Sequence, residues 1–596
     1  MNILSIILFF QIFVLPGLIL YIKKEKEIGK MIVKVIISSL AVNIFSFSFI
    51  LLIRNTIDFE LLFIASIFSF LISFLLRKII KKGEISLKFL KNDLWLLLLL
   101  SISFLVNFTL FFHQKSIVGA DVGRFGIISH SIFLKGKFET NLEPYDMAKD
   151  FFYFPSLILI PPLFEVVGVD PITFLSFLVF FFSSLYALPI YLITKKLLNE
   201  DVAISSFLFS SFLFNPLINI GFFGVFPYAI SIFFFLSLLY FVLEKKKDFI
   251  PICTSLIGLI SFHMYPSILL IPFLVSLFIV NFQTLSFVLD KKFWKFLLFF
   301  SLFFIPYFLK TYSSFFVPFQ MERKLDIFMF STFNRNLSLK EKLQYILFSS
   351  PVGFNKNILL VVGLIVFLFS SIRNFRRFKF GIKFLTLSFI LCIPMLLITF
   401  NDMNLARSIW INWFFYSIGL GLLLNDKKLN LLILALIAIT KLSPSIFSYF
   451  ELQTTYEKGQ IPWVVWSSFY DAIDFIKQNT SKDSIFLIDG GGAGCTGASA
   501  SYGERIFPLT SRKIFYFSDY CWAQYDEGEY RKKVTIYREF SINPSNIHII
   551  QELKRYGITH VFIGPTDVGL DKNLFNNSSL YKLIYENKDF KIFKIL

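Results

Sequence analysis

Apolar runs of about twenty residues, almost free of charge, recur along most of the chain, from Asn2–Tyr21 to a last run that ends near Thr440. A helix of about 20 residues crosses the roughly 30 Å hydrocarbon core of a bilayer, so each run is a candidate membrane span. After Trp463 the runs become shorter and alternate with polar segments, which is typical of a soluble α/β fold. The sequence therefore predicts a mostly α-helical, polytopic membrane domain over residues 1–446 and a soluble α/β domain over residues 447–596.

Clusters of lysine and arginine between the apolar runs predict how the chain threads the membrane. Cytoplasmic loops are enriched in these residues, so all the rich clusters are expected on one face. They lie at residues 23–34, 77–91, 195–196, 245–247, 291–292, 373–383 and 427–428. Each consecutive pair encloses two apolar runs, an even number of crossings, and the total is about fourteen transmembrane helices.

One apolar segment, Phe154–Val167, does not fit this count, because a crossing there would place every later basic cluster outside. It is short and contains Pro161 and Glu165, so we expect a re-entrant or surface helix. The resulting topology is that of a multi-pass protein of the cell membrane. It places the long loop at about 113–170 and the C-terminal domain on the external face.

The amino-acid composition agrees with a membrane protein. Hydrophobic residues make up 56% of the chain, charged residues 16%, and the mean hydropathy is +0.69, so the excess apolar surface is expected to face lipid. The net charge of +18 would suit nucleic acid, but the basic residues lie in short clusters between apolar runs. This distribution favours membrane-flanking loops and no nucleic-acid partner. Cys495 and Cys521 are either a disulfide pair in an oxidising exterior or two free thiols.

The external loop predicted at about 113–170 contains far more polar chemistry than the other loops between apolar runs. Asp121 lies just beyond the end of a membrane helix. Positions at helical spacing follow it, at Phe125, Ile128, Ser129, Ile132 and Phe133. The pattern predicts an amphipathic helix along the membrane interface, with Asp121 near its N-terminal end. There the helix dipole favours the ionised carboxylate.

An ordered series of features continues from this acid. They are Asp121, the predicted helix 124–134, Gly136-Lys137-Phe138, Phe154-Pro155, Val167-Gly168 and the helix ending at Lys195-Lys196. The series resembles that of the GT-C glycosyltransferases, polytopic enzymes that take a sugar from a polyprenyl-phosphate carrier on the external face of the membrane. The resemblance covers roughly residues 90–250, and neither an Asp-x-Asp nor a Trp-Trp-Asp motif is found, so it identifies no particular family.

The resemblance implies transfer of a polyprenyl-phosphate-linked sugar to an external glycan, lipid or protein acceptor. Asp121 would be the general base that takes the acceptor's proton, and cationic groups would hold the departing phosphate. Arg124 either binds that phosphate or pairs with Asp121. His130 either faces the same cavity or is an interfacial histidine without a catalytic role.

Three further candidates for substrate binding lie at predicted external ends of helices. His263 and Tyr265 lie in a tight turn, where they would touch a sugar or a phosphate, although Tyr265 also suits the aromatic belt of the membrane interface. Arg407 opens a predicted membrane helix, and a late external arginine resembles the donor-phosphate ligand of several GT-C enzymes. The alternative for Arg407 is contact with lipid headgroups.

The cofactor is not predicted by any motif. A divalent metal ion would fit if Glu143, Asp146 and Asp150 joined Asp121, whereas the alternative is that they are solvated loop charges. Two other classes of function stay open, a flippase for lipid-linked glycans and a non-catalytic assembly subunit. A flippase would carry ionisable residues inside its helices near mid-membrane, and the predicted spans are nearly free of them.

The C-terminal domain is predicted from its own periodicity. We expect helices at 467–478 and 543–556, strands at 484–488 and 560–563, and a closing helix or strand pair at 581–595. The glycine-rich segment after the first strand lacks Gly-Lys-Ser/Thr, so nucleotide binding is not expected. Pro508 and Arg512 resemble a Pro-x-x-x-Arg region in external domains of uncharacterised GT-C-like proteins.

Overall fold

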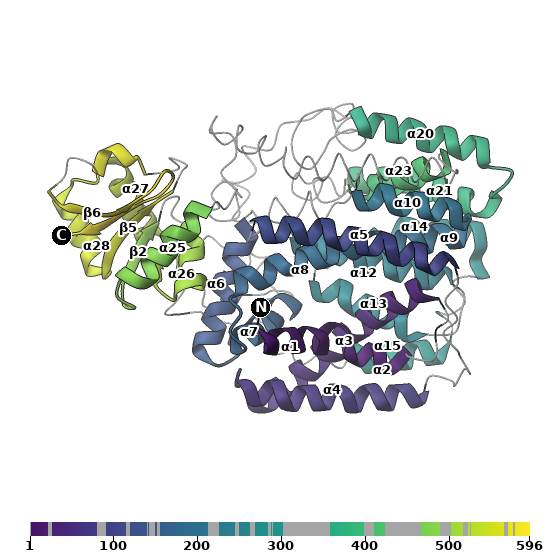
Figure 1. The fold of residues 1–596 in the computed structure, drawn as a ribbon, viewed down its shortest axis with the longest axis horizontal. Helices are drawn as coiled ribbons and strands as arrows, with labels where there is room; N and C mark the ends of the chain where they lie inside the picture. Colours follow the sequence, from purple (N-terminus) through teal and green to yellow (C-terminus); the bar gives the residue numbers. More distant parts are fainter. Residues whose placement is uncertain are drawn as a thin grey trace.

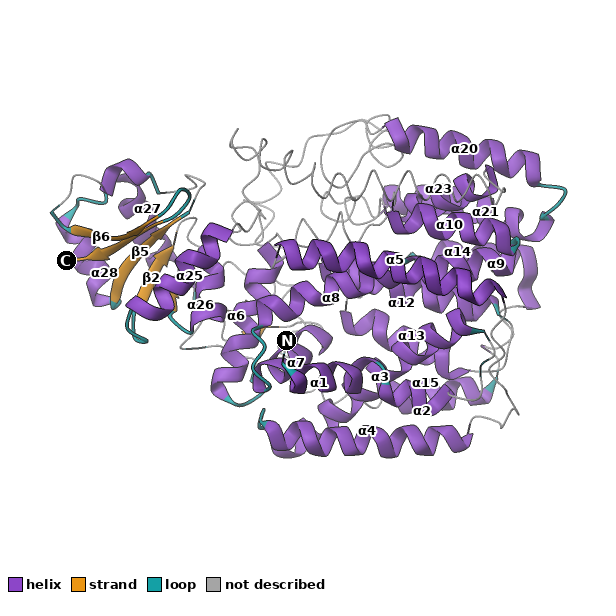
Figure 2. Ribbon diagram, viewed as in Figure 1, coloured by secondary structure: helices purple, strands orange, loops and turns teal. Residues whose placement is uncertain are grey.

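The computed structural model describes residues 2–21, 25, 27–79, 91–114, 120–139, 141, 143, 150–151, 155–212, 226–244, 249–262, 269–283, 288, 290–301, 358–398, 410–423, 467–488, 502–515, 523–524, 526–564, 570–575 and 579–596. In these residues a bundle of long helices lies beside a smaller C-terminal domain (Figure 1). Figure 2 shows the strands gathered in that domain, while the bundle is helical.

The bundle begins with α1 (Ile3–Phe13), α2 (Leu15–Tyr21), α3 (Ile28–Arg54), α4 (Phe59–Ile79) and α5 (Lys91–Gln114). It continues, beyond the site described below, with α8 (Pro171–Leu185), α9 (Ala187–Leu197), α10 (Glu200–Phe212), α12 (Phe226–Leu243), α13 (Phe249–Phe262), α14 (Leu270–Asn281), α15 (Lys291–Ser301), α20 (Ile358–Asn374), α21 (Lys379–Ile398) and α23 (Trp410–Leu423). Each of these helices overlaps one of the apolar runs from which the spans are predicted. Those runs lie at about 2–21, 31–53, 59–76, 93–112, 171–194, 202–218, 224–243, 249–264, 267–285, 295–310, 357–371, 384–400 and 407–424.

Within the part of the chain that the structure describes, three helical segments are long and apolar enough to cross a membrane: Ile28–Leu51, Phe59–Lys78, and Pro171–Leu197, which is formed by α8 and α9. The pair α1 and α2, bent by 41°, would be a fourth. Helix α4 leaves a row of large apolar side chains exposed along its length, at Phe59, Phe63, Ile67, Leu71, Phe74 and Leu75. Such a row on the outside of a bundle suits contact with lipid. The total of about fourteen spans stays a prediction.

The bend between α1 and α2 is stabilised by polar side chains of α3. Asn43 donates from Nδ2 to the carbonyls of Gln11 and Ile12, at 2.9 and 3.0 Å, and the Ser39 hydroxyl accepts from the Gly17 amide at 2.7 Å. A break in an apolar helix leaves backbone groups without their usual partners, and in hydrocarbon each one is costly. These side chains supply the missing partners, so the bend is a built feature of the fold.

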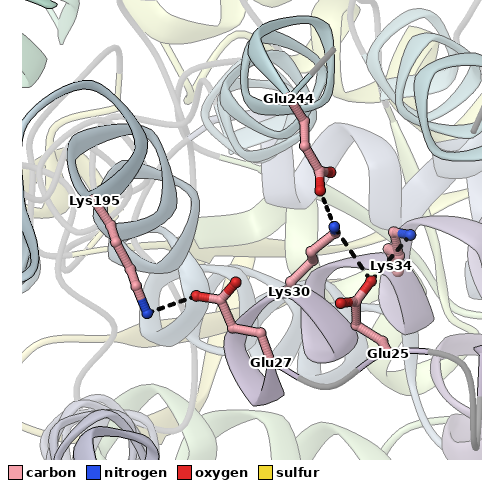
Figure 3. Close-up of polar contacts among 6 residues, drawn as sticks. All are labelled: Glu25, Glu27, Lys30, Lys34, Lys195 and Glu244. Carbon is pink, nitrogen blue, oxygen red and sulfur yellow. Dashed lines mark hydrogen bonds and ion pairs between the residues drawn. The ribbon is translucent and has the colours of Figure 1, made fainter. Parts of the chain in front are cut away.

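At the end of the bundle away from the C-terminal sheet, residues of the predicted cytoplasmic clusters 23–34 and 195–196 meet Glu244, which directly precedes the cluster 245–247 (Figure 3). Lys30, only 2% exposed, lies between Glu25 and Glu244, with Nζ 3.3 Å from the Glu25 carboxylate. Lys34 pairs with the same carboxylate at 3.2 Å, and Lys195 with Glu27 at 2.8 Å. Burial opposes ionisation of Glu25, but Lys34 and Lys30 outweigh it and hold the pKa of that carboxyl below its usual range.

The C-terminal domain is a mixed five-stranded sheet in the order β3-β2-β5-β7-β6. The strands are β2 (Ile485–Ile488), β3 (Lys513–Phe515), β5 (Ile558–Ile563), β6 (Tyr581–Glu586) and β7 (Lys591–Ile595). Strand β2 is parallel to β3 and β5, whereas β7 is antiparallel to β5 and β6. The closing element therefore is the strand pair and not a helix.

The longer helices described in this domain are α25 (Ser467–Asn479), α27 (Glu527–Ile542) and α28 (Ile547–Arg555). The predicted helix 467–478 and both predicted strands are present. The predicted start of the helix 543–556 is wrong, because Asn543 ends α27 and the side chain of Asn546 caps α28 by accepting from the amide of His548. The asparagine three residues further on is the one whose backbone is extended, as an N-cap requires.

Candidate active site

Asp121 is the second residue of helix α6 (Ala120–Lys135), and Arg124 lies one turn further on. Their side chains are outside the described part of the chain. The helix ends at Gly136, whose φ of +63° is a left-handed conformation that favours glycine. The expected helix and its glycine end are thus both present, with Asp121 in the first turn. At that position the unpaired backbone amides favour a carboxylate.

After α6, the chain forms α7 (Pro155–Val166), a short helix whose middle is buried. A re-entrant or surface helix is predicted here, and its place relative to the membrane stays a prediction. It ends before Gly168, where φ is +82°. Helix α8 then opens at Asp170-Pro171, with the Asp170 carboxylate accepting from the Thr173 amide at 2.8 Å. The order of elements in the predicted series is therefore that of the structure.

Helix α6 is buried on two faces, which differs from the predicted interfacial helix with one polar face toward water. The residues buried along it are Val122, Gly123, Phe125, Gly126, Ile127, Ile128, Ser129, His130, Ser131 and Ile132. It packs on α7 and α8, and also on two C-terminal segments, the 3-10 helix η3 (Tyr502–Arg505) and α26 (Ile506–Thr510). The contact with η3 and α26 was not predicted, because these segments lie far along the chain from α6.

Two glycines of α6 allow this close approach. A Cβ placed on Gly123 would lie 2.8 Å from the Glu504 carboxylate, and one on Gly126 would lie 3.2 Å from the Pro508 ring and 2.5 Å from Ile172. Gly123, Gly126 and His130 follow one another at spacings of three and four, so they share a helix face. That face is the one that the C-terminal domain covers.

His130, on α6, contacts both helix α7 and the C-terminal domain. Its Nδ1 lies 2.6 Å from Oε2 of Glu165, whose other oxygen accepts from the Ser129 hydroxyl at 2.5 Å, and its Nε2 lies 3.0 Å from Oγ of Ser511. The ring of Phe507 packs edge-on against the imidazole at 4.9 Å. Burial raises the pKa of the Glu165 carboxyl, and the interaction with His130 offsets this only in part.

The position of His130 on α6 bears on its role. It follows Asp121 by nine residues, which at 100° per residue places the two on opposite faces, about 13 Å apart along the axis. Both ring nitrogens already have protein partners. This arrangement favours a histidine that joins elements over one that faces the cavity of Asp121. Sequence periodicity did not predict the pairing, although a lone Glu165 in an apolar helix was a signal for a buried partner.

A second connection ties the external loop to the C-terminal domain. Strand β1 (Asp150–Phe151) pairs antiparallel with β4 (Ala523–Gln524), so that Asp150 is opposite Gln524 and Phe151 opposite Ala523. The loop that carries Asp121 is thereby attached to the domain at two separate places.

The predicted substrate-binding residues His263, Tyr265 and Arg407 lie outside the described residues.

Arg512 donates to the carbonyls of Lys477 and Thr480 at 2.9 and 3.0 Å, at the end of α25, and this explains the arginine as a helix cap.

Among the predicted metal ligands, Glu143 is exposed, Asp146 lies outside the described residues and the side chain of Asp150 is not described. Within the described residues, no group of three His, Cys, Asp or Glu is placed to hold a metal ion.

The chain is similar to several solved structures. One is the archaeal oligosaccharyltransferase AglB from Archaeoglobus fulgidus in complex with an inhibitory peptide and a dolichol-phosphate, with 13% identity, a TM-score of 0.43, and 79% of this chain and 69% of that chain covered. Another is ArnT from Cupriavidus metallidurans in the apo state, with 12% identity, a TM-score of 0.47, and coverages of 84% and 97%. No family model and no curated protein matches the sequence.

Proposed function

We propose that this chain is a membrane glycosyltransferase that moves a sugar from a polyprenyl-phosphate carrier to an external glycan, lipid or protein acceptor. Asp121 acts as the general base, and Arg124 binds the phosphate of the carrier. The observation that carries the proposal is helix α6, which presents Asp121 in its first turn at the end of an apolar bundle. An acid there can meet both a lipid-linked donor in the membrane and an acceptor from water.

The chemistry follows from this position. Glycosyl transfer needs the acceptor hydroxyl or amide to lose its proton as the new bond to the sugar forms, and a carboxylate within hydrogen-bond reach accepts it. The leaving group is a phosphate, which a nearby arginine stabilises as negative charge develops. His263, Tyr265 and Arg407 are proposed to line the same site as sugar and phosphate ligands.

The test is the change Asp121→Asn, which keeps the shape of the side chain and removes the base. Transfer of labelled sugar from polyprenyl-phosphate donors to membrane acceptors should fall by about 100-fold or more, the usual contribution of general base catalysis. The matched control is Glu139→Gln, which neutralises an acid beyond the other end of α6 that contacts only Lys135 among the contacts described, at 3.5 Å.

Both variants must be compared at equal amounts in the membrane. Loss of transfer in Asp121→Asn together with normal transfer in Glu139→Gln supports the assignment. Undiminished transfer in Asp121→Asn would overturn the base assignment and favour the flippase or the assembly subunit.

A further inference from the structure

The contacts between α6 and the C-terminal domain form a continuous set along one helix face. Glu504 packs on Gly123, Pro508 on Gly126, and Ser511 on His130, so successive turns of α6 are each matched by one residue of segment 502–511. Helices α7 and α8 also pack on α6, with Glu165 of α7 at His130 and Ile172 of α8 at Gly126. Helix α6 therefore cannot rotate or slide without breaking contacts with both the bundle and the C-terminal domain.

The hydrogen-bonded chain Ser511–His130–Glu165 fixes the register of this match. It passes from the domain through α6 to α7, and its two bonds are 3.0 and 2.6 Å long. Packing contacts tolerate small displacements, whereas hydrogen bonds of this length weaken steeply with distance and angle. A shift of the domain along α6 would leave the buried imidazole without one partner, which is costly in an apolar site.

The order of hydroxyl, imidazole and carboxylate is also that of serine hydrolases. Such an enzyme needs backbone amides to stabilise an oxyanion beside the serine. Here the Ser511 amide donates to the Phe507 carbonyl at 2.8 Å, and the Arg512 amide donates to the Thr510 hydroxyl at 3.1 Å. Neither amide is available to an oxyanion, so the chain suits holding elements together and not acyl transfer.

We propose that Ser511, His130 and Glu165 are positioning residues, through which the C-terminal domain sets the placement of helix α6 and so of the base on its first turn. The inference rests on the proposed function, because it assigns the domain a part in the same site. Docking of the C-terminal domain on α6 can be tested without measuring any activity. In the active protein the C-terminal domain packs on α6, and the hydrogen bond of the Ser511 hydroxyl stabilises this contact.

Docking can be measured with a pair of cysteines. A Cβ on Gly123 lies 3.1 Å from the Cβ of Glu504, close to the roughly 3.5–4.5 Å that a disulfide spans, and replacing Glu504 removes the side chain that would collide with it. In the full-length chain, Gly123→Cys with Glu504→Cys should therefore cross-link under mild oxidation.

The decisive variant is Ser511→Gly. Ser511 has φ of +60°, so glycine removes the hydroxyl while suiting the backbone better. In the cysteine pair, this change should slow cross-linking by about fivefold, the effect of one hydrogen bond. In the chain with its native Gly123 and Glu504, it should lower kcat by about tenfold with the KM for donor unchanged, because a misplaced base affects the reaction and not binding. The unfolding midpoint should not fall.

The control is Ser541→Ala, which removes a hydroxyl of the same domain that donates to the Arg538 carbonyl within its own helix, at 2.8 Å. It should change neither readout. Absence of the cross-link in the parent pair would overturn the docking, and Ser511→Gly with unchanged cross-linking or unchanged kcat would overturn the positioning role. Failure of the proposed function looks different, since Asp121→Asn would then leave transfer intact while cross-linking still responds to Ser511→Gly.

Discussion

Several buried polar side chains in this protein have partners from distant parts of the chain. Asn43 serves the bend between α1 and α2, Lys30 lies between two glutamates, and His130 connects three elements. Each such group would cost several kcal/mol if left unpaired in an apolar interior. The polar residues within the helices are therefore a guide to which helices must meet.

His560 on β5 gives a prediction at this scale. Its ring stacks on Phe486 at 4.9 Å, and burial, with a smaller effect of Lys594, lowers the pKa of His560 to about 4 from the usual 6.5. The unfolded chain takes up this proton near pH 6.5 and the folded chain only near pH 4. The stability that neutral His560 contributes is thus complete above pH 6.5 and is lost as the pH falls toward 4.

We expect the unfolding midpoint of the C-terminal domain, followed by near-ultraviolet circular dichroism of the full-length protein, to fall between pH 7 and pH 5. In His560→Gln, which cannot take up a proton, the fall should be smaller. An equal fall in both proteins would show that other groups carry the pH dependence.

At the scale of elements, helix α6 shows what periodicity predicts and what it does not. Apolar positions predicted the helix, because spacing alone decides which side chains share a face. Its glycine end was predicted from the resemblance to the GT-C series. The second buried face was not predicted. Gly123, Gly126 and His130 carry no hydrophobic signal, and their partners in segment 502–511 lie hundreds of residues away. The same limit misplaced the start of α28, where Asn543 and Asn546 are both suitable caps.

The bend between α1 and α2 gives a prediction for a single element. Asn43→Leu fills the same space but removes donors to the carbonyls of Gln11 and Ile12. The unfolding midpoint in detergent should drop, with a loss of about 1–3 kcal/mol for the unsatisfied groups. Ser46→Ala is the control, since the Ser46 hydroxyl bonds only its own helix, at Val42, among the contacts described. Equal midpoints for Asn43→Leu and Ser46→Ala would mean that the bend does not need these bonds.

For the whole molecule, the predicted topology has a direct test. The charged residues of Figure 3 bring together clusters from 23–34, 195–196 and the end of α12, as expected if these share one face of the membrane. The C-terminal domain lies at the other end of the bundle (Figure 1). Which end faces outward was predicted from charge alone.

We expect a membrane-impermeant maleimide to label Ile542→Cys, which is 79% exposed on the C-terminal domain, in intact cells. Arg376→Cys, between α20 and α21, should be labelled only after the cells are opened. Both changes are made with Cys495 and Cys521 replaced by serine. Labelling of Arg376→Cys in intact cells would reverse the topology.

The span over which the C-terminal domain contacts α6 sets an order of events during synthesis. His130 and Ser511 are 381 positions apart. At about 5–20 residues per second, a ribosome needs on the order of 20–80 s to make the intervening chain. For that interval the nascent protein contains the Asp121 helix without its cover. A product that terminates before segment 502–511 would therefore lack the residues that cover this face of α6.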